Sequence, residues 1–397
     1  IIDLSKEKGG LTPVKKGGGM ASNSLRMQVE SGKQYNLRSI RKDYTKLVPD
    51  GFDNLKLLDL LKDQNSAGHP YGPLIIPTLS KAAGVYYTDP KVVFLQHQKG
   101  LGNYNSQFSE ELYLLEERPN GDWSDAAQFG NSKEIIGYVD LLDRLNQKKN
   151  HFVDQHWTLK SRMFDLFIHD WDRHDDQWRW ASFKEGDQTI YRPIPRDRDQ
   201  DFYKFRGLVP GYVAAFMQRK FKTIKENVRD VKYLSFNARN FDRYFLNDLD
   251  WSDWKSIIKK LQEDITEADI EKSMTFFPKE TLSLDEDEEL TRLLKARRLN
   301  LMDIGRRYYE FLAKEVEISG SDDKEQFEIT RNDDGSVQVQ VFVQRDKKDD
   351  LLKYDRTFIP SETKEIRLFG LRGKDDFKIN GSDKSSIKIR IIGGEDK

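Results

Sequence analysis

The chain has 397 residues, no cysteine and a formal net charge of -1. Since 66 Lys and Arg residues are matched by 67 Asp and Glu residues, the composition argues against a basic nucleic-acid-binding protein and against an acidic tail. Without cysteine there are no disulfides, thiolate metal sites or Cys nucleophiles. No apolar run approaches the roughly 18 residues of a membrane helix.

The two ends of the chain favour a piece of a longer protein. The chain starts at Ile1 rather than at methionine, and it stops at Lys397 just after a predicted strand and turn. The absence of a targeting signal from this sequence therefore says little about where the protein is located. The lack of cysteine suits an oxidising compartment, where stray thiols are a liability.

The N-terminal third alternates apolar and polar residues with a period of two, which predicts an antiparallel sheet. Strands are predicted at 11–16, 24–29, 34–40, 91–95 and 112–117. Helices are predicted at 54–65 and 80–83. Ser132 is the expected cap of a further helix whose apolar face would comprise Ile135, Ile136, Val139 and Leu142.

The middle of the chain carries the residues with the clearest chemical pattern. A helix at 155–171 is followed by a hairpin with strands at 178–183 and 189–194. An acidic loop precedes the hairpin and another follows it; their residues are His169, Asp170, Asp172, His174, Asp175 and Asp176, then Asp197, Asp199 and Asp201. Two such loops at the ends of one hairpin could hold a divalent cation and orient a nucleophile. The alternative is a solvated ion-pair network, because nearby arginines and a lysine roughly match these acids.

The C-terminal part changes from helix to strand. Residues 215–316 have the apolar period of helices, and strands are predicted at 327–330 and 337–343. The segment 366–370 recurs weakly at 389–393, which suggests a small β-solenoid or sandwich. A single imperfect Ca²⁺-binding repeat, with Gly373, Asp375 and Phe377 in place, is more simply a turn.

The order of elements in the middle of the chain resembles the protein-kinase-like superfamily in its atypical branch, which includes the CotH-type, HipA-type and secreted Golgi-type kinases. Asp172, Arg173 and His174 resemble the catalytic loop of that superfamily, and Asp197 resembles the metal-binding Asp after the hairpin. The resemblance implies an α+β fold with a small β lobe at 1–118, a helical lobe at 119–318 and a separate β module at 319–397.

The same resemblance implies roles for individual residues. Asp172 would accept or orient the proton of the attacking hydroxyl, while Asp197, with Asp199 as a second ligand, would hold Mg²⁺ or Mn²⁺. Gln177 stands where the family usually has a metal-binding Asn, and Arg38 stands where it has a phosphate-pairing Lys. The remaining nucleotide-binding candidates are the turn Gly17, Gly18 and Gly19, the hinge residue Glu116, and Asp63 as the acidic partner of Arg38.

Three functions are compatible with these residues. The first is an ATP- and Mg²⁺-dependent phosphotransferase with an unknown acceptor. The second is an inactive kinase-like domain with a structural or interaction role, suggested by the departures at Arg38 and Gln177. The third is a metal-dependent phosphohydrolase, since His169 and Asp170 are adjacent as in the HD family.

A further resemblance concerns the setting of the domain. Most of the chain is similar to a region of large Bacteroidota surface proteins, in which a metallophosphoesterase domain precedes the region and an outer-membrane β-barrel follows it. This implies location in the cell envelope, attachment to the outer membrane through the rest of the protein, and other envelope proteins as partners.

Overall fold

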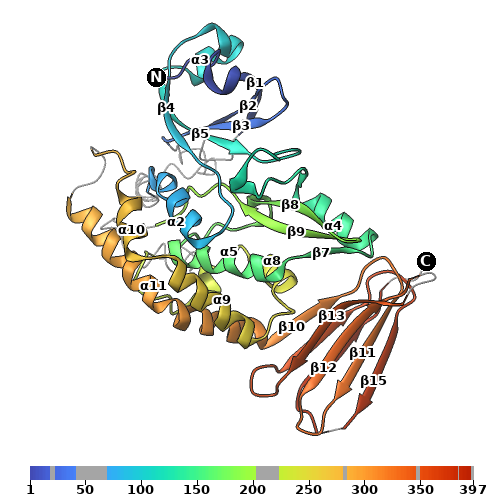
Figure 1. Ribbon diagram of the computed structural model, residues 1–397. Helices are drawn as coiled ribbons and strands as arrows, with labels where there is room; N and C mark the ends of the chain where they lie inside the picture. Colours follow the sequence, from blue (N-terminus) through green and yellow to red (C-terminus); the bar gives the residue numbers. More distant parts are fainter. Residues whose placement is uncertain are drawn as a thin grey trace, which may run out of the picture.

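The computed structural model describes residues 1–17, 23–41, 69–202, 223–279, 284–345, 349–382 and 384–394. It has a small β lobe and a larger helical lobe, together an α+β fold, followed by an all-β module (Figure 1). The small β lobe lies at one end, the helical lobe in the middle and the β module at the other end. The predicted α+β class, with a small β lobe, a helical lobe and a following β module, is therefore confirmed.

The small lobe is an antiparallel five-stranded sheet in the order β1-β2-β3-β5-β4. Its strands are β1 (Thr12–Gly17), β2 (Ser24–Gln28), β3 (Gln34–Ser39), β4 (Lys91–Leu95) and β5 (Glu111–Arg118). Strict alternation of buried and half-buried residues on β2 and β3 sends Leu25, Met27, Tyr35 and Leu37 into one core. The other face of the sheet consequently carries Arg26, Asn36 and Arg38 toward the helical lobe. All five predicted strands are confirmed within one or two residues.

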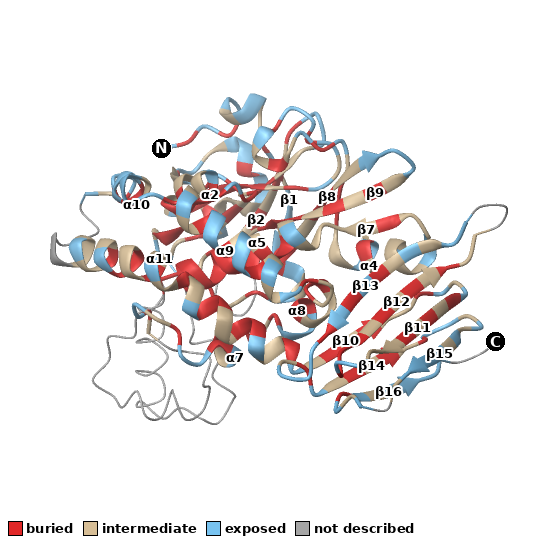
Figure 2. Ribbon diagram, turned by 60° about the horizontal axis from the view of Figure 1, so that its bottom comes forward, coloured by how far each residue is buried: buried red, intermediate tan, exposed pale blue. Residues whose placement is uncertain are grey.

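The helical lobe is built around one long buried helix. This is α5 (Gln155–Ile168), whose first turn is capped by Asp154, which accepts the N–H of Trp157 at 2.9 Å. The other helices are α2 (Ile76–Ala83), α3 (Asn105–Phe108), α4 (Tyr138–Gln147), α7 (Val231–Leu234), α8 (Arg239–Phe245), α9 (Trp251–Asp264), α10 (Glu267–Met274) and α11 (Leu284–Ala313). Figure 2 shows the buried stripes of α5, α9 and α11 facing one another, and these form the largest hydrophobic core.

The hairpin that follows α5 belongs to a second small sheet. Its strands are β6 (Ile135–Ile136), β7 (His151–Val153), β8 (Trp178–Glu185) and β9 (Gln188–Pro195), in the order β6-β8-β9-β7. Trp178 and Trp180 are fully buried and stack on Phe241, with centroid distances of 4.5 and 5.7 Å. The tryptophans therefore pack within the core, as their alternation on a strand indicates.

The helix predicted after Ser132 was placed wrongly. Ile135 and Ile136 form strand β6, while α4 begins later at Tyr138, and Val139 is 68% exposed. The Ser132 hydroxyl donates to the carbonyl of Glu134 instead of capping a helix. Two adjacent β-branched residues pair with β8, and this tertiary contact outweighs the apparent helical spacing.

The C-terminal module consists of two sheets that share one core. The strands are β10 (Glu315–Ser319), β11 (Glu325–Arg331), β12 (Val337–Val343), β13 (Leu351–Phe358), β14 (Glu365–Phe369), β15 (Asp376–Gly381) and β16 (Lys388–Ile392), in the orders β10-β14-β16 and β13-β12-β11-β15. The weak repeat has a structural basis, because β14 and β16 pair in parallel with Ile366 opposite Ile389. The parallel pairs β10·β14, β14·β16 and β11·β15 lie in two sheets between which the chain alternates, and the first strand begins four residues before the predicted boundary at 319.

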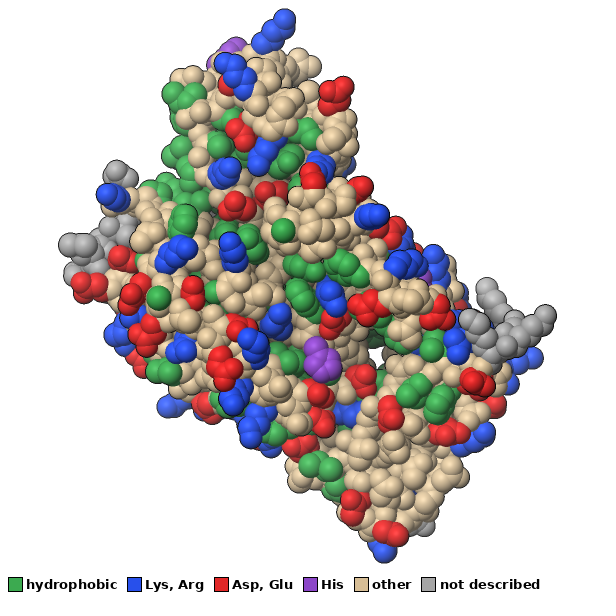
Figure 3. Space-filling view, viewed as in Figure 1, with side chains coloured by type: hydrophobic (Ala, Val, Ile, Leu, Met, Phe, Trp, Pro, Cys, Tyr) green, Lys and Arg blue, Asp and Glu red, His purple; other side chains and the backbone are tan. Residues whose placement is uncertain are grey.

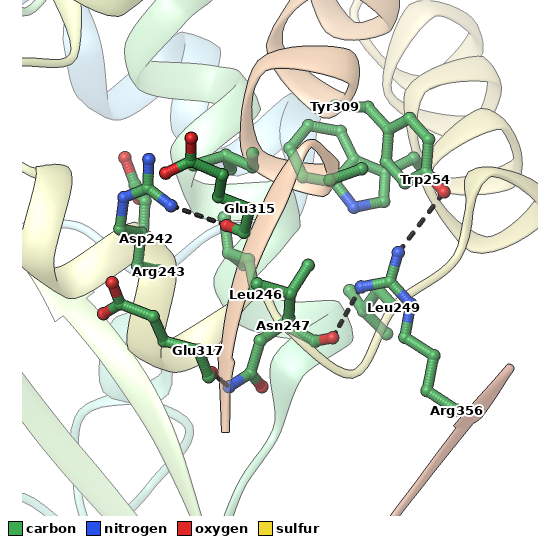
Figure 4. A pocket seen from close by; sticks show the side chains of 13 residues that line it. Asp242, Arg243, Leu246, Asn247, Leu249, Trp254, Tyr309, Glu315, Glu317 and Arg356 are labelled. Atoms are coloured by element: carbon green, nitrogen blue, oxygen red, sulfur yellow. Dashed lines mark hydrogen bonds between the residues drawn. The ribbon is translucent and has the colours of Figure 1, made fainter. Parts of the chain in front are cut away.

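Side-chain hydrogen bonds fasten the module to the helical lobe (Figure 4). Arg356 donates to the carbonyl of Asn247 at 2.6 Å and to the hydroxyl of Tyr309 at 3.3 Å. The amide of Asn247 donates to the carbonyl of Glu317 at 2.7 Å, and Arg243 donates to that of Glu315 at 2.7 Å. Because β10 follows α11 with only one residue between them, the module has little freedom to move against the lobe.

The face of the molecule drawn in Figure 3 shows no single dominant charge. On the face in Figure 3, acidic and basic side chains are interspersed, in keeping with the balanced composition. In the described segments, no helix has both the length and the apolar composition needed to span a membrane.

Glu325, at the start of β11, should make the stability of the module depend on pH. Its side chain is 1% exposed and accepts the hydroxyl of Ser321, and burial raises its pKa from 4.5 to about 7. An acid with a raised pKa binds its proton more tightly in the folded state, so stability falls as pH rises from about 4.5 to about 7. Glu325→Gln should remove this fall, as measured by denaturant unfolding across the same range.

The control for this variant is Glu328→Gln on the same strand. It should leave the dependence of stability on pH as it is in the natural chain. Equal pH profiles for Glu325→Gln and the natural chain would contradict the assignment to Glu325.

Candidate functional site

The first acidic loop begins where α5 ends. His169 takes a left-handed conformation with φ of 62° and terminates the helix, and its N–H bonds the carbonyl of Leu166. Asp172 follows, and its carboxylate accepts the side-chain amide of Asn237 at 2.7 Å. Its own N–H donates to Asp170 at 3.3 Å. The carboxylate of Asp172 is thus held in a defined orientation while remaining partly exposed.

Arg173 joins this loop to the one after the hairpin. Its side chain is 1% exposed and donates to the carbonyl of Arg196 at 2.7 Å, directly before Asp197. It also lies 3.2 Å from the carboxylate of Asp170 and 3.4 Å from the amide oxygen of Gln177. Arg173 therefore acts as a structural tie between the two acidic loops, which the sequence could only predict to converge.

Asp197 occupies a strained position at the start of the second loop. Its φ is 61°, a conformation that non-glycine residues rarely adopt and that is often found at functional sites. Its carboxylate forms an ion pair with Arg38 from β3 of the small lobe. Arg38 Nη1 is also 3.9 Å from Asp199. The predicted phosphate-pairing cation and the predicted metal-binding acids therefore lie together, although about 160 residues separate them in the sequence.

Arg38 makes a second ion pair, with Glu116 of β5 at 3.0 Å. Thr88 donates a long hydrogen bond of 3.4 Å to the other oxygen of Glu116. The acidic partner of Arg38 among the described residues of the small lobe is thus Glu116, which the sequence analysis placed at the hinge. The predicted partner, Asp63, lies outside the described residues, as do Gly18 and Gly19.

The ionisation of Asp197 and Glu116, the two acidic partners of Arg38, depends on burial and on the neighbouring charges. Burial would raise the pKa of Asp197, but Arg38 and Arg196 hold it below its ordinary value. Burial raises the pKa of Glu116, and Arg38 offsets only part of that rise. Asp197 is therefore ionised at neutral pH, which is the state that a hard divalent cation requires of a carboxylate ligand.

The remaining predicted residues are placed less favourably for their roles. His174 is exposed, and its Nε2 lies 3.2 Å from the amide nitrogen of Gln177. The side chain of Gln177 is shared between His174 and Arg173, so it is already engaged within the protein. Gly17 closes β1 opposite Ser24. In the segments that the structure describes, no group of three or more His, Cys, Asp or Glu residues is arranged as a complete metal site.

The His169–Asp170 pair does not form the centre of a phosphohydrolase site in this structure. The carboxylate of Asp170 is fully buried and lies 3.2 Å from Arg173 and 3.3 Å from Arg198. Burial raises its pKa to about 6 despite these two arginines. This carboxylate belongs to a buried ion-pair network, whereas the alternative interpretation of the acidic run was a solvated one.

Two features of the site were missed from the sequence. Asn237, which orients Asp172, is 65 residues downstream, and a single Asn in a helical region carries no recognisable signal. The other feature is a set of arginines from both lobes, namely Arg26, Arg118, Arg179 and Arg196, which interact with one another electrostatically. Alternation on strands β2 and β8 could have indicated that Arg26 and Arg179 face away from their own cores.

Comparison with known proteins finds no matching family model and no matching curated sequence. Among solved structures, the proinflammatory kinase CtkA of Helicobacter pylori is similar, with 12% identity over 75% of this chain and 95% of that chain and a TM-score of 0.38. The Rio2 kinase of Chaetomium thermophilum, solved as an ADP/Mg²⁺–phosphoaspartate complex, has 13% identity over 74% and 71% of the two chains and a TM-score of 0.31. The amicoumacin kinase hAmiN, solved with AMP-PNP and Ca²⁺, has 12% identity over 74% and 88% and a TM-score of 0.18.

Proposed function

We propose that the chain is a phosphotransferase domain that binds ATP with Mg²⁺ or Mn²⁺ between its lobes and transfers phosphate to an acceptor in the cell envelope. The observation that carries the proposal is the ion pair between Arg38 of the small lobe and Asp197 of the large lobe. In this ion pair, the guanidinium of Arg38, which is suited to binding phosphate, lies next to the ionised carboxylate of Asp197, which is suited to binding a metal ion.

Each residue has a defined part in this proposal. Asp197, with Asp199 beside it, would hold the metal ion, which would neutralise charge on the nucleotide phosphates. Arg38 would pair with the phosphates and stays anchored by Glu116. Asp172, oriented by Asn237, would accept the proton of the attacking hydroxyl.

The decisive test is ATP binding with and without Mg²⁺ or Mn²⁺, measured by calorimetry on the natural chain and on Asp197→Ala. We expect metal-dependent binding by the natural chain and its loss in the variant, because a carboxylate ligand of the metal is removed. Arg38 keeps its partner Glu116 in the variant, so a cooperative unfolding transition should be retained.

The matched control is Asp187→Ala, which removes an exposed aspartate from the turn between β8 and β9. It should bind ATP as the natural chain does. Absence of ATP binding by a natural chain that unfolds cooperatively would refute the nucleotide site.

An inactive kinase-like domain is the second candidate, and a specific observation favours it. The face of the small-lobe sheet that looks toward the helical lobe carries the polar residues Arg26 and Asn36 next to Arg38. A nucleobase usually packs against apolar side chains, which these positions do not offer. Metal-dependent ATP binding without release of phosphate would assign the chain to this second class.

The envelope location, the outer-membrane β-barrel in the same protein and the other envelope partners belong to the proposal. They are supported by the resemblance of the sequence to Bacteroidota surface proteins. Fractionation of cells, with detection of this chain in the membrane fraction, tests them.

A further inference from the structure

A cavity of about 410 Å³ lies between the helical lobe and the C-terminal module, and neither Asp172 nor Asp197 lines it. Its lobe side is formed by β7, β9, the first turn of α5 and the loop after α8, and its module side by strands β10, β11, β12 and β13. Figure 3 shows the surface hollowed where the lobe meets the module. The volume falls within the range of about 300–1,000 Å³ that is usual for small-molecule sites.

Hydrogen bonds between the two parts of the chain hold the walls of this cavity in place. The hydroxyl of Tyr354 and the guanidinium of Arg356, both on β13, donate to the carbonyl of Asn247 at 2.7 and 2.6 Å. Tyr354 and Asn247 themselves line the cavity. The cavity is therefore a preformed feature of the fold, as most small-molecule sites are.

Part of the wall is apolar. Phe152 of β7 is paired with Ile190 of β9, so the two side chains lie next to each other on one face of the sheet. Tyr244 of α8 lines the same cavity. All three residues are half-buried, so they offer an apolar surface to the body of a ligand.

Lys353 of β13 supplies a cation on the module side of the cavity. Its Nζ donates to the carbonyl of His151 at 2.9 Å and lies 4.2 Å from the centre of the Phe152 ring. Glu325 and Asp323 attract this ammonium, but among the described residues no carboxylate forms an ion pair with it. Burial lowers the pKa of Lys353 to about 8, so the side chain remains mostly protonated at neutral pH. An ammonium has three N–H donors, so two remain for a ligand.

Asp248, in the loop after α8, supplies an acid on the lobe side. Its backbone N–H donates to the side-chain oxygen of Gln155 at 3.0 Å, which fixes the loop against the first turn of α5. Burial raises the pKa of the Asp248 carboxyl to about 6, although Arg356 and the N–H of Asp355 act in the opposite direction. Within the described segments this carboxylate forms no ion pair, although it is mostly ionised at neutral pH.

Other charged residues that line the cavity are already engaged within the protein. Arg192 pairs with Asp154 at 2.9 Å and with Glu185 at 3.5 Å. Glu325 accepts a hydroxyl of its own module. The cation of β13 and the acid after α8 are therefore the charges that remain for a ligand.

We propose that this cavity binds a small zwitterion with an apolar body, namely an amino acid or a dipeptide, whose carboxylate pairs with Lys353 and whose ammonium pairs with Asp248. These two charges face one cavity without pairing with each other, so a ligand with a single charge would leave the other desolvated and unpaired. The apolar side chain of the ligand would lie along Phe152 and Ile190. The site is separate from the proposed nucleotide site and does not depend on it.

The test measures binding of L-phenylalanine and of the dipeptide L-phenylalanylglycine to the natural chain at neutral pH, by calorimetry and thermal unfolding. At least one of these zwitterions should bind and raise the unfolding temperature. Phenethylamine lacks the carboxylate and hydrocinnamate lacks the ammonium. Each should bind at least about tenfold more weakly than the zwitterion, because each forms only one of the two ion pairs.

Two variants assign the two ends of the ligand. Lys353→Met keeps an unbranched apolar side chain near Phe152 and should weaken the zwitterion and hydrocinnamate, but not phenethylamine, at least about tenfold. Asp248→Asn keeps an acceptor oxygen for the N–H of Asp355 and should weaken the zwitterion and phenethylamine, but not hydrocinnamate. A general loss of structure would not give this crossed pattern, since each variant should retain one singly charged ligand.

The control is Lys378→Met, which removes an exposed lysine of β15 that does not line the cavity. It should leave the affinity for all four compounds unchanged. Failure of both zwitterions to bind a natural chain that unfolds cooperatively would overturn the proposal. Equal affinity for a zwitterion and a singly charged compound, or unchanged zwitterion affinity in both variants, would overturn it as well.

Discussion

Asp172→Asn should lower the rate of phosphate transfer by about 10²–10⁴-fold, the usual contribution of a general base. The amide oxygen of Asn can still accept the hydrogen bond that Asn237 donates to Asp172 at 2.7 Å. The loop geometry should therefore be preserved while the proton acceptor is lost. The measurement is release of labelled γ-phosphate from ATP in the presence of Mg²⁺, with water or the chain itself as the acceptor.

The ATP affinity separates this effect from damage to the site. Asp172→Asn should bind ATP and metal as the natural chain does, because the residue is not assigned to the phosphates or the metal. Asp176→Asn, an exposed change four residues away, should retain the natural rate. A natural rate in Asp172→Asn would remove this residue from the proposed mechanism. A natural chain that binds ATP but releases no phosphate would identify the inactive domain.

Asp242→Ala should reduce the free energy of unfolding by about 3–5 kcal/mol, as expected when one partner of a buried ion pair is removed. Asp242 is fully buried on α8, and Arg162 of α5 donates to it at 2.6 and 3.0 Å. The hydroxyl of Tyr308 on α11 also donates to it. The variant leaves the guanidinium of Arg162 buried with Asp165 as its remaining carboxylate. Denaturant unfolding measures the loss.

Two further variants show whether the loss comes from the stranded charge. The double variant Arg162→Met/Asp242→Leu removes both charges and should recover part of the stability, because no unpaired ion stays buried. Asp264→Ala breaks an exposed ion pair with Lys260 on α9 and should change the free energy of unfolding by less than about 0.5 kcal/mol. A loss in Asp242→Ala as small as that of Asp264→Ala would contradict a structural role for the network.

The rate of phosphate transfer and the free energy of unfolding report on different parts of the molecule. The network of Arg162 and Asp242 holds α5, α8 and α11 together. Through Asp165 and Arg198 it is also linked to Asp170, two residues before Asp172. A loss of stability there would affect activity indirectly. Activity should therefore be compared only between variants that unfold at similar denaturant concentrations.

Local sequence patterns determined the elements of this protein. Period-two alternation predicted the small-lobe strands, and helical spacing predicted α5, because a half-buried strand or helix must place apolar residues on one face. The order of an acidic loop, a hairpin and a second acidic loop predicted Asp172 and Asp197 as partners in one site. The prediction of a helix after Ser132 was wrong because two adjacent isoleucines are equally compatible with a short strand. This strand, β6, pairs with β8, which is distant in the sequence.

Only the tertiary structure decided which charges meet. The ion pair of Arg38 with Asp197 and the orientation of Asp172 by Asn237 both join segments far apart in the chain. From the sequence alone, every Asp or Glu is an equally good ion-pair partner for every Lys or Arg, since the residues of each type carry the same charge. The fold decides which of these residues pair, and an ion pair contributes most to stability where burial excludes water.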